Sequence, residues 1–368
     1  MPQAGGHRAR AVGKAGSVGA SWRQHYDRLH LHTDRGHSGL PGLAMPRAYP
    51  HYPARAHVVA YLENYADHFG LRPRFDTVVT RAVRENGAWR ADTMRAGVAE
   101  TFRAPALVVA TGFAAWPFRP AWPGENIFGG DIRHSRDYRN PAPYAGKRVL
   151  VVGFGNSGGE IALDLAEAGV AVTLAVRGPV NIVPRDLFGI PILTWAIVMG
   201  ALPPRLADFL TAPLTRLSVG SLKRLGLVRA ATGPLAGLRK TGRVPLLDIG
   251  TVAKIRAGAI GVRPGVRALA AGTVEFDDGR REPYDAIILA TGFRPDLRPL
   301  LPGALDTLDD AGMPKISGGA TAVAGLYFCG FYISPTGQLR EIGLEARRIA
   351  RDIAGHIARA LRSESPSS

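Results

Sequence analysis

The stretch that most constrains the fold is residues 147–177, which read KRVLVVGFGNSGGEIALDLAEAGVAVTLAVR. Arg148–Val152 is a short run of mainly β-branched residues, and this pattern predicts a buried parallel strand. Three glycines spaced G-x-G-x-x-G follow, and residues 160–168 have the apolar spacing of a helix that Gly169 ends. Residues 170–176 predict a second strand. The stretch therefore predicts one strand–helix–strand unit with a glycine loop at the start of its helix.

Each glycine of this loop has a physical role in binding a dinucleotide. Gly153 permits the tight turn, Gly155 lets a pyrophosphate approach the backbone, and Gly158 lets the helix pack close to the strand. We expect the cofactor to contact these glycines and the two residues between them, Asn156 and Ser157. The alternative is a glycine-rich turn without a ligand, which the flanking strands and helix disfavour.

Arg177 ends the second predicted strand of the unit. An acidic residue at this position would bind a ribose 2′-hydroxyl and favour NAD, whereas an arginine suits a 2′-phosphate. The sequence therefore favours NADP, and an ordinary surface arginine is the alternative.

Composition narrows the class of protein. A chain of 368 residues is long enough for two domains, and its net charge of +16 comes mostly from scattered arginines. No nucleic-acid fold signature accompanies this charge, so we expect phosphate-rich ligands and no nucleic-acid partner. Cys329 is the single cysteine, which excludes internal disulfides and cysteine-rich metal sites. We expect no metal and a reducing, cytoplasmic setting.

The most apolar stretch is residues 187–202, about 16 residues with Pro191 inside. This is shorter than the ~20 residues that a membrane span needs. A buried helix is the first expectation. The alternative is a helix at a membrane surface or at a substrate entry, which implies peripheral membrane contact.

Further elements follow from periodicity and turn signals. Asn86-Gly87 predicts a hairpin between residues 77–83 and 88–94. Helices are predicted at residues 55–69, 203–229 and 344–361, and short buried strands at 106–110, 286–290 and 325–329.

A second motif resembles the flavin-containing monooxygenases. Residues 128–138 match that group's F-x-G-x-x-x-H-x-x-x-aromatic signature, with Phe128, Gly130, His134 and Tyr138 at its fixed positions. Within the group the chain is most similar to the plant YUCCA-type indole-pyruvate monooxygenases. The matching stretches include residues 26–29, 146–158, 183–185, 247–251 and 288–293, and the likeness covers about residues 19–353.

The resemblance implies an α/β fold with two Rossmann-like, three-layer ββα dinucleotide-binding domains and the cofactors FAD and NADP. The NADP-binding domain is expected at residues 142–284. It is inserted into an FAD-binding domain made of residues 1–141 and 285–368.

The resemblance also implies cofactor contacts outside the glycine loop. His32 is a candidate for the flavin surroundings, at a position where many family members carry asparagine, and no catalytic side chain is assigned. His134 is expected to have a structural role. The remaining expected contacts are Trp22, Val79, Thr111, Gly112, Thr291, Gly292 and Gly330, of which Trp22 has plain core packing as its alternative.

The family pattern is not matched at the start of the chain. A first strand with its own glycine fingerprint needs ~30 residues, and only 18 residues precede Gly19. We therefore expect an FAD-binding domain without its first strand and fingerprint, with residues 1–18 as replacement sequence from a truncated or frame-shifted reading frame. The loss would expose apolar surface on residues 106–110 and 325–329.

The activity that the resemblance implies is monooxygenation with NADPH and O₂. NADPH gives hydride to FAD, and the resulting flavin hydroperoxide passes one oxygen atom to a small organic substrate, either a soft N or S nucleophile or a keto acid or ketone. Two alternatives stay open, an NADPH-dependent reductase and an inactive NADP-binding fragment.

Overall fold

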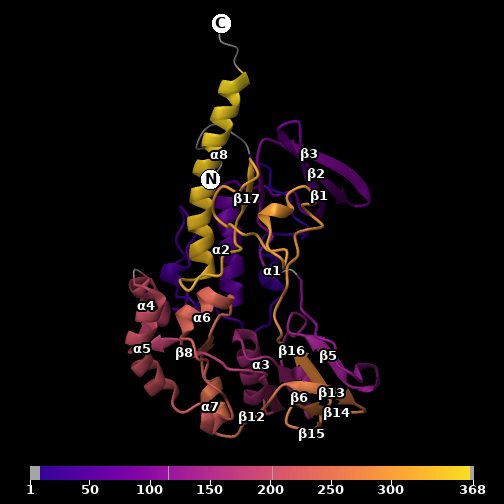
Figure 1. Ribbon diagram of the computed structural model, residues 1–368, viewed down its shortest axis with the longest axis vertical. Coiled ribbons are helices and arrows are strands. Elements are labelled where there is room, and N and C mark those ends of the chain that lie inside the picture. Colours follow the sequence, from indigo (N-terminus) through magenta and orange to yellow (C-terminus); the bar gives the residue numbers. More distant parts are fainter. Residues whose placement is uncertain (1–8, 115, 201, 365–368) are drawn as a thin grey trace. The chain divides into compact units, whose positions relative to one another are not determined.

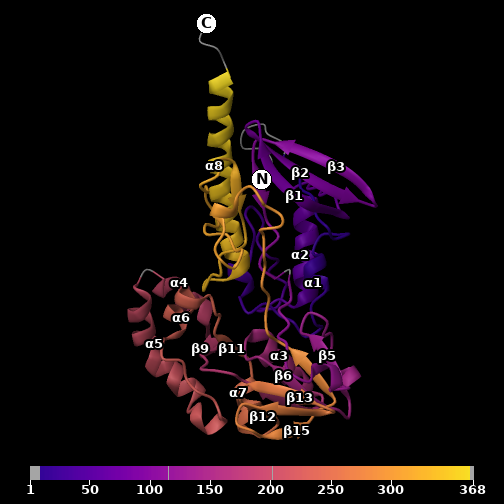
Figure 2. The same cartoon turned by 45° about the vertical axis from the view of Figure 1, so that its right-hand side comes forward.

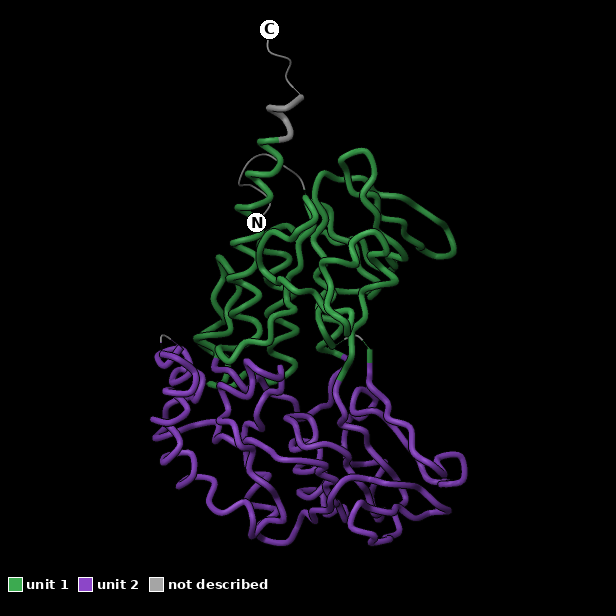
Figure 3. Tube along the Cα trace, viewed as in Figure 1, with its two compact units in different colours: residues 1–23, 35–116, 293–368 green, residues 24–34, 117–292 purple. Residues whose placement is uncertain are grey.

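The computed structural model describes residues 9–114, 116–200 and 202–364. Contacts between Cα atoms divide the chain into two compact units (Figure 3). Unit 1 comprises residues 1–23, 35–116 and 293–368, and unit 2 comprises residues 24–34 and 117–292. Residues 24–34, 117–141 and 285–292 therefore pack with the glycine loop in unit 2. Which cofactor each segment binds stays a prediction.

A five-stranded parallel sheet forms the centre of unit 2. Its order is β12 (Ile260–Arg263), β7 (Ala171–Ala175), β6 (Arg148–Val152), β16 (Ala286–Leu289) and β5 (Asp131–His134). The predicted strands at residues 148–152, 170–176 and 286–290 are thus confirmed. β6 lies in the middle because its run RVLVV is buried on both faces.

Unit 2 has three layers: the parallel sheet lies between a helical layer on one face and an antiparallel sheet on the other (Figure 1). Val149 and Val151 pack with Ile161 and Leu165 of α3 (Asn156–Glu167). Leu150 of β6 instead packs on the opposite face, against a three-stranded antiparallel sheet. That sheet consists of β13 (Val266–Ala270), β14 (Thr273–Phe276) and β15 (Arg281–Pro283). The predicted ββα layering is therefore present in unit 2.

Unit 1 repeats this layering around a smaller parallel pair, β4 (Leu107–Val109) and β17 (Leu326–Phe328). One face packs against the antiparallel sheet of β1 (Thr77–Glu85), β2 (Ala88–Arg95) and β3 (Val98–Ala104). On the other face, Tyr327 and Cys329 pack against Ile349 of α8 (Gln338–Glu364). Unit 1 also contains α1 (Ala20–Arg23) and α2 (Arg55–His68), which contact each other.

The remaining elements of unit 2 form a subregion between β7 and β12 in sequence (Figure 2). Its helices are α4 (Ile192–Met199), α5 (Pro204–Val219), α6 (Pro234–Thr241) and α7 (Thr251–Arg256). Its strands are β8 (Ile182–Pro184), paired in parallel with β11 (Leu246–Asp248), and the hairpin of β9 (Asp186–Leu187) and β10 (Ile190–Pro191).

Short 3₁₀ turns occur in both units. They lie at Arg35–His37, Glu125–Ile127, Ala142–Tyr144, Lys223–Leu225 and Leu305–Thr307.

Several predicted elements need correction. The helix after the glycine loop begins at Asn156, four residues before its first predicted residue, because the loop residues themselves form its first turn. The hairpin at Asn86-Gly87 is confirmed, but a third strand, Val98–Ala104, was not predicted because its side chains are mostly exposed. The prediction of a buried helix within residues 187–202 is wrong, since Leu193 is the one buried residue of α4 and Phe188 is 73% exposed.

Of the two segments expected to expose apolar surface, residues 106–110 and 325–329, only the first does so. Val108 of β4 is 40% exposed, and within the described chain β4 pairs only with β17. The prediction is wrong for residues 325–329, because β17 is covered by α8 on one face and by the antiparallel sheet on the other.

The segment expected to be replacement sequence is partly described. Residues 1–8 lie outside the described residues. Val12 forms a parallel bridge with Arg74, and the N–H of Thr77 donates to the carbonyl oxygen of Gly13 at 2.9 Å. Residues 11–15 therefore run beside residues 74–77. No helix in the described ranges is long and apolar enough to cross a membrane.

Candidate functional site

The glycine loop brings three backbones together at the start of α3. A Cβ atom on Gly153, whose φ is +113°, would lie 2.3 Å from the carbonyl oxygen of Ala290 at the end of β16. A Cβ atom on Gly158 would lie 2.2 Å from the carbonyl oxygen of Gly153. A Cβ atom on Gly155 would meet nothing within 4 Å. The first and third glycines are thus required by packing, and the second leaves the backbone open to a ligand.

The first turn of α3 provides the groups that bind an anion. The first amides of a helix have no acceptor within the helix, and the N-terminal end of its dipole is positive. The first turn of α3 contains no acidic side chain. Asn156 accepts a 2.8 Å hydrogen bond from the N–H of Leu247 through its Oδ1, so its side chain fixes β11 against the loop. A pyrophosphate therefore fits the open backbone at Gly155.

The acidic face of α3 is bound by residues 24–34. Glu160, Asp164 and Glu167 lie at helical spacing, and Glu160 is only 2% exposed. The Tyr26 hydroxyl donates to Oε2 of Glu160 at 3.1 Å, and Nε2 of His32 lies 2.5 Å from Oε1. On the next turns of the helix, Arg28 pairs with Glu167 and lies 3.8 Å from Asp164. Residues 24–34 are therefore bound along α3 from Glu160 to the last residue of the helix, Glu167.

Burial sets the protonation states along this face. Burial and the neighbouring Glu160 raise the pKa of Tyr26, so its hydroxyl keeps the proton that it donates. The Tyr138 hydroxyl, which ends the second sequence motif, donates to Asp164 at 2.7 Å. Burial raises the pKa of Asp164, and the hydrogen bond from Tyr138 opposes this rise. The motif thus stabilises the helix that follows the glycine loop.

His32, the candidate for the flavin surroundings, contacts Glu160 in unit 2. Its Nδ1 atom is buried and has no hydrogen-bond partner among the described residues. The structure therefore gives His32 a contact with the helix of the glycine loop. A role near a flavin stays a prediction.

His134 connects the second motif to the end of β16. Its Nε2–H donates to the carbonyl oxygen of Gly292 at 3.0 Å, and its Nδ1 accepts the N–H of Arg136 at 3.1 Å. This pattern assigns the neutral tautomer with the proton on Nε2. Burial lowers the pKa of His134, which favours the same neutral form. The contacts agree with the structural role expected for this residue.

Thr291 and Gly292 are held by the same connection. The Thr291 hydroxyl donates to the carbonyl oxygen of Phe118, and the N–H of Phe118 donates to the carbonyl oxygen of Gly292 at 2.9 Å. Gly292 has φ +80°, which a side chain would strain. These residues follow β16, whose end also contacts Gly153, so they lie at the same edge of the sheet as the glycine loop.

Arg177 follows β7 at this edge of the sheet and is exposed. A Cβ atom on Gly265 would lie 3.2 Å from Cγ of Arg177, so the stem of the arginine packs on that backbone. Within the described part of the chain its guanidinium has no ion pair. Its charge is therefore available to an anion.

The other predicted contacts lie in unit 1. Trp22 is half-buried in α1, and Val79 precedes a bulge in β1. Thr111 is exposed after β4, and Gly112 has φ +68° with open space where a Cβ would be. Gly330 follows β17, and its N–H donates to Oε2 of Glu345 at 2.5 Å. That amide is thus engaged by α8.

Neither Glu160 nor Glu345 is among the residues that the sequence predicts for the site. Both are fully or almost fully buried carboxylates, and both hold a predicted site segment in place. For Glu160 a signal was available, because acidic residues at positions 160, 164 and 167 mark one helix face. The sequence contains no comparable pattern that would predict the contact between Glu345 and Gly330.

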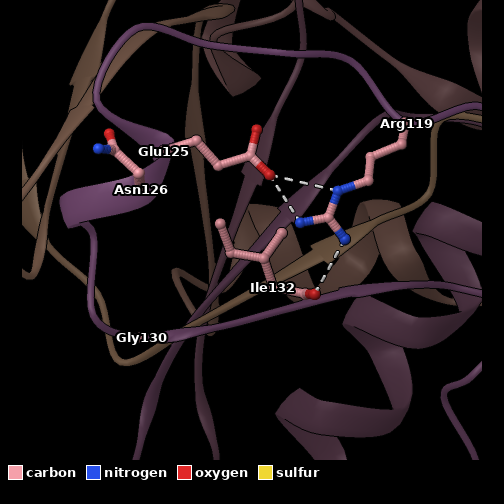
Figure 4. A pocket seen from close by; sticks show the side chains of 5 residues that line it. All are labelled: Arg119, Glu125, Asn126, Gly130 and Ile132. Atoms are coloured by element: carbon pink, nitrogen blue, oxygen red, sulfur yellow. Dashed lines mark hydrogen bonds and ion pairs between the residues drawn. The ribbon is translucent and has the colours of Figure 1, made fainter.

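An open hollow of about 470 Å³ lies elsewhere in unit 2 (Figure 4). Arg119 crosses it, donating to Glu125 at 2.6 Å and to the carbonyl oxygen of Ile132 at 3.3 Å. Because its arginine is already paired and no residue of the glycine loop lines it, we assign it no role in the site.

The glycine geometry gives a first prediction. Gly158→Ala should destabilise the protein by ~1–3 kcal/mol, because the new methyl group would meet the backbone of Gly153. Gly155→Ala should change the free energy of unfolding by no more than ~0.5 kcal/mol and should weaken NADPH binding. Thermal melts and titration of NADPH fluorescence measure the two effects. Equal destabilisation by both substitutions would contradict the assignment.

His134 gives a prediction about pH. Its folded pKa is below the ordinary value of ~6.5, so the unfolded chain binds more protons as the pH falls below that value. The stability that neutral His134 contributes is complete above pH ~6.5 and is lost as the pH falls toward the folded pKa.

The test is a melting-temperature series between pH 8 and 5 for the natural protein and for His134→Gln. The variant should lose ~1–3 kcal/mol at pH 8 and should show a flatter pH dependence than the natural protein. A parallel pH dependence in the two proteins would contradict the role of His134.

Comparisons with known proteins agree with this geometry. The family model described as flavin-binding monooxygenase-like matches residues 24–310. The chain is 39% identical to indole-3-pyruvate monooxygenase YUCCA1 of Oryza sativa subsp. japonica over 314 residues, covering 84% of this chain and 76% of that protein. It is 37% identical to the probable indole-3-pyruvate monooxygenase YUCCA3 of Arabidopsis thaliana over 352 residues, covering 93% and 80%.

Two solved structures share the fold. A double mutant of a flavin monooxygenase from Stenotrophomonas maltophilia is similar with a TM-score of 0.73 and 24% identity, covering 96% of this chain and 92% of that one. Cyclohexanone monooxygenase from Rhodococcus sp. Phi1, solved with NADP⁺ bound, has a TM-score of 0.72 and 18% identity, covering 96% and 80%. The glycine loop, the second motif and the family match together show that this chain belongs to the flavin-binding monooxygenase family and is a flavin-dependent monooxygenase.

Proposed function

We propose that this enzyme uses NADPH and O₂ to transfer one oxygen atom to a small 2-keto acid or ketone. The support for the substrate class is the identity of 37–39% to proteins named as indole-3-pyruvate monooxygenases. A soft nitrogen or sulfur nucleophile is the alternative substrate within the same chemistry. The single cysteine, Cys329, favours a reducing compartment such as the cytoplasm.

The observation that carries the proposal concerns the glycine loop. The backbone at Gly155 is open to a ligand, whereas the other two glycines of the loop are packed against neighbouring backbone. Gly153 and Gly158 are in contact with neighbouring backbone, so the loop is fixed before any ligand binds. The pyrophosphate of NADPH would lie against Gly155 and the amides of Asn156 and Ser157. Arg177, whose charge is unpaired among the described residues, would bind the 2′-phosphate.

When bound, the flavin supplies the redox chemistry with O₂ that this family uses. The chain's own contribution is to position the cofactors through groups that are already held in place. Thr291 and Gly292 are fixed by Phe118 and His134 at the edge of the sheet that carries the glycine loop. Trp22, Val79, Thr111, Gly112 and Gly330 are proposed as flavin contacts, and we assign no side chain as a general base.

A specific observation favours a second candidate, an NADP-binding protein without oxygenase activity. The N–H of Gly330, one of the proposed flavin contacts, is already bound to Glu345. The glycine loop proposed to bind the nucleotide, in contrast, is held in place by residues of unit 2 alone. We propose an NADP-binding domain at residues 142–284 and an FAD-binding domain at residues 1–141 and 285–368. With this division, NADP binding could persist without FAD binding.

The proposed function predicts a coupled reaction. With FAD added, the purified protein should oxidise NADPH faster when indole-3-pyruvate is present, and oxygenated product should accumulate in proportion to NADPH consumed. The visible spectrum with added FAD shows whether flavin binds, and mass spectrometry of the product measures coupling. NADPH binding without a flavin spectrum would support the second candidate. Flavin-dependent NADPH oxidation without product from keto acid, amine or thioether would indicate a reductase.

Arg177 predicts the choice of nucleotide. Arg177→Ala should weaken NADPH binding by ~10–100-fold, the effect of losing a hydrogen bond to a charged phosphate, and should leave NADH binding almost unchanged. Titration of each nucleotide measures the two dissociation constants. Arg95→Ala is the matched control, because Arg95 is an exposed arginine on β2 in unit 1. An equal loss for NADH would overturn the assignment.

A further inference from the structure

The helix α5 presents its apolar side chains outward. Leu206, Phe209, Leu210 and Leu217 lie at helical spacing, and all four are exposed. Phe209 is 75% exposed and Leu217 is 83% exposed. We call these four residues the α5 apolar face. A surface helix of a globular protein normally turns such a stripe toward its own core, so this face requires another explanation.

The inward side of α5 is small or polar and already has its partners. Asp208 is buried, and its carboxylate accepts the N–H groups of Leu235 and Ala236 at 2.9 Å each. These bonds cap the first turn of α6. Thr215, also buried, donates to the carbonyl oxygen of Thr211 at 3.2 Å. Rotating the helix to bury its leucines would break the two bonds between Asp208 and α6 and expose Thr215, so the outward orientation is fixed by the fold.

Two neighbouring elements also carry exposed apolar side chains. Phe188, between β9 and β10, and Val198 of α4 are strongly exposed. Figures 1 and 2 both place α4 beside the start of α5. The helices are too short to cross a bilayer, but α5 has the exposed apolar face and the basic residues of a helix that lies in the surface of one.

The segment of the chain that carries this surface is mostly basic. Residues 188–246 contain a single acidic residue, Asp208, which is buried as the cap of α6. The same residues contain eight basic side chains, and within the described chain none of them forms an ion pair with an acidic residue. They are Arg205, Arg216, Lys223, Arg224, Arg229, Arg239, Lys240 and Arg243. The partner of this region should therefore be negatively charged.

We propose that the α5 apolar face and its basic surroundings bind the surface of an anionic phospholipid bilayer. Leucine and phenylalanine side chains would enter the boundary of the acyl chains, and Arg205 and Arg216 of the same helix would meet lipid phosphates. A second copy of the chain fits less well, because a symmetric contact through this face would bring the two basic regions together. The proposal is independent of the proposed substrate.

The test is co-sedimentation of the purified full-length protein with vesicles. Vesicles of phosphatidylglycerol and phosphatidylcholine in equal parts should bind the protein, and vesicles of phosphatidylcholine alone should bind it at least about tenfold more weakly. Added salt should weaken binding to the anionic vesicles. Failure of the natural protein to bind the anionic vesicles at low salt would overturn the proposal.

Variants separate the apolar contribution from the charge. Phe209→Ser with Leu217→Ser should reduce binding to the anionic vesicles at least about tenfold, and Arg216→Glu should reduce it about fivefold or more. Val98→Ser is the control, because Val98 is 60% exposed on β3 in unit 1. Thermal melts should be unchanged, since these side chains are exposed. Binding by the double variant equal to that of the control would overturn the proposal.

A protein partner would give a different result. If sedimentation without vesicles shows concentration-dependent self-association that Phe209→Ser with Leu217→Ser abolishes, a second copy occupies the face and the proposal is wrong. If the natural protein stays monomeric and binds the anionic vesicles, the lipid surface is its partner.

Discussion

The close approach of three backbones at the start of α3 determines the rest of unit 2. A side chain on Gly153 would meet the carbonyl oxygen of Ala290, and one on Gly158 would meet the carbonyl oxygen of Gly153. The contact fixes where β6 ends, where α3 begins and where β16 lies beside them. Once these positions are set, the backbone at the remaining glycine of the loop, Gly155, is left open. The proposed ligand site is therefore a consequence of how the two neighbouring glycines pack.

A buried carboxylate provides the second constraint. Leaving Glu160 buried without partners would cost several kcal/mol, and its partners come from residues more than 100 positions earlier in the chain. Tyr26 and His32 therefore draw residues 24–34 into unit 2, although the residues on either side of that segment belong to unit 1. The same helix face receives Tyr138 from the second motif through Asp164. One face of α3 thus connects the two segments that precede the glycine loop in sequence.

The sequence is sufficient to predict those elements that depend on residues close together in the chain. The parallel strands Arg148–Val152 and Ala286–Leu289 and the hairpin at Asn86-Gly87 follow from β-branched runs and turn residues. The loop glycines are also local, because the strand and helix beside them identify their function. The partners of Glu160 and of Gly330 could not be predicted, since they are tertiary contacts between distant segments. The strand Val98–Ala104 could not be predicted, because an exposed strand carries no apolar alternation.

The prediction of a buried helix within residues 187–202 is wrong, and the next helix along the chain, α5, shows why an apolar pattern alone does not place a helix. An apolar run indicates that its side chains avoid water, but it does not say which surface covers them. In α5 the small and polar residues face the protein because Asp208 caps α6, and a helix has room for only one inward face. The apolar residues are then forced outward by the requirement to satisfy the first amides of α6. A hydrogen-bonding constraint inside the fold therefore produces an apolar surface outside it, and the surrounding arginines and lysines restrict what can cover that surface to something anionic.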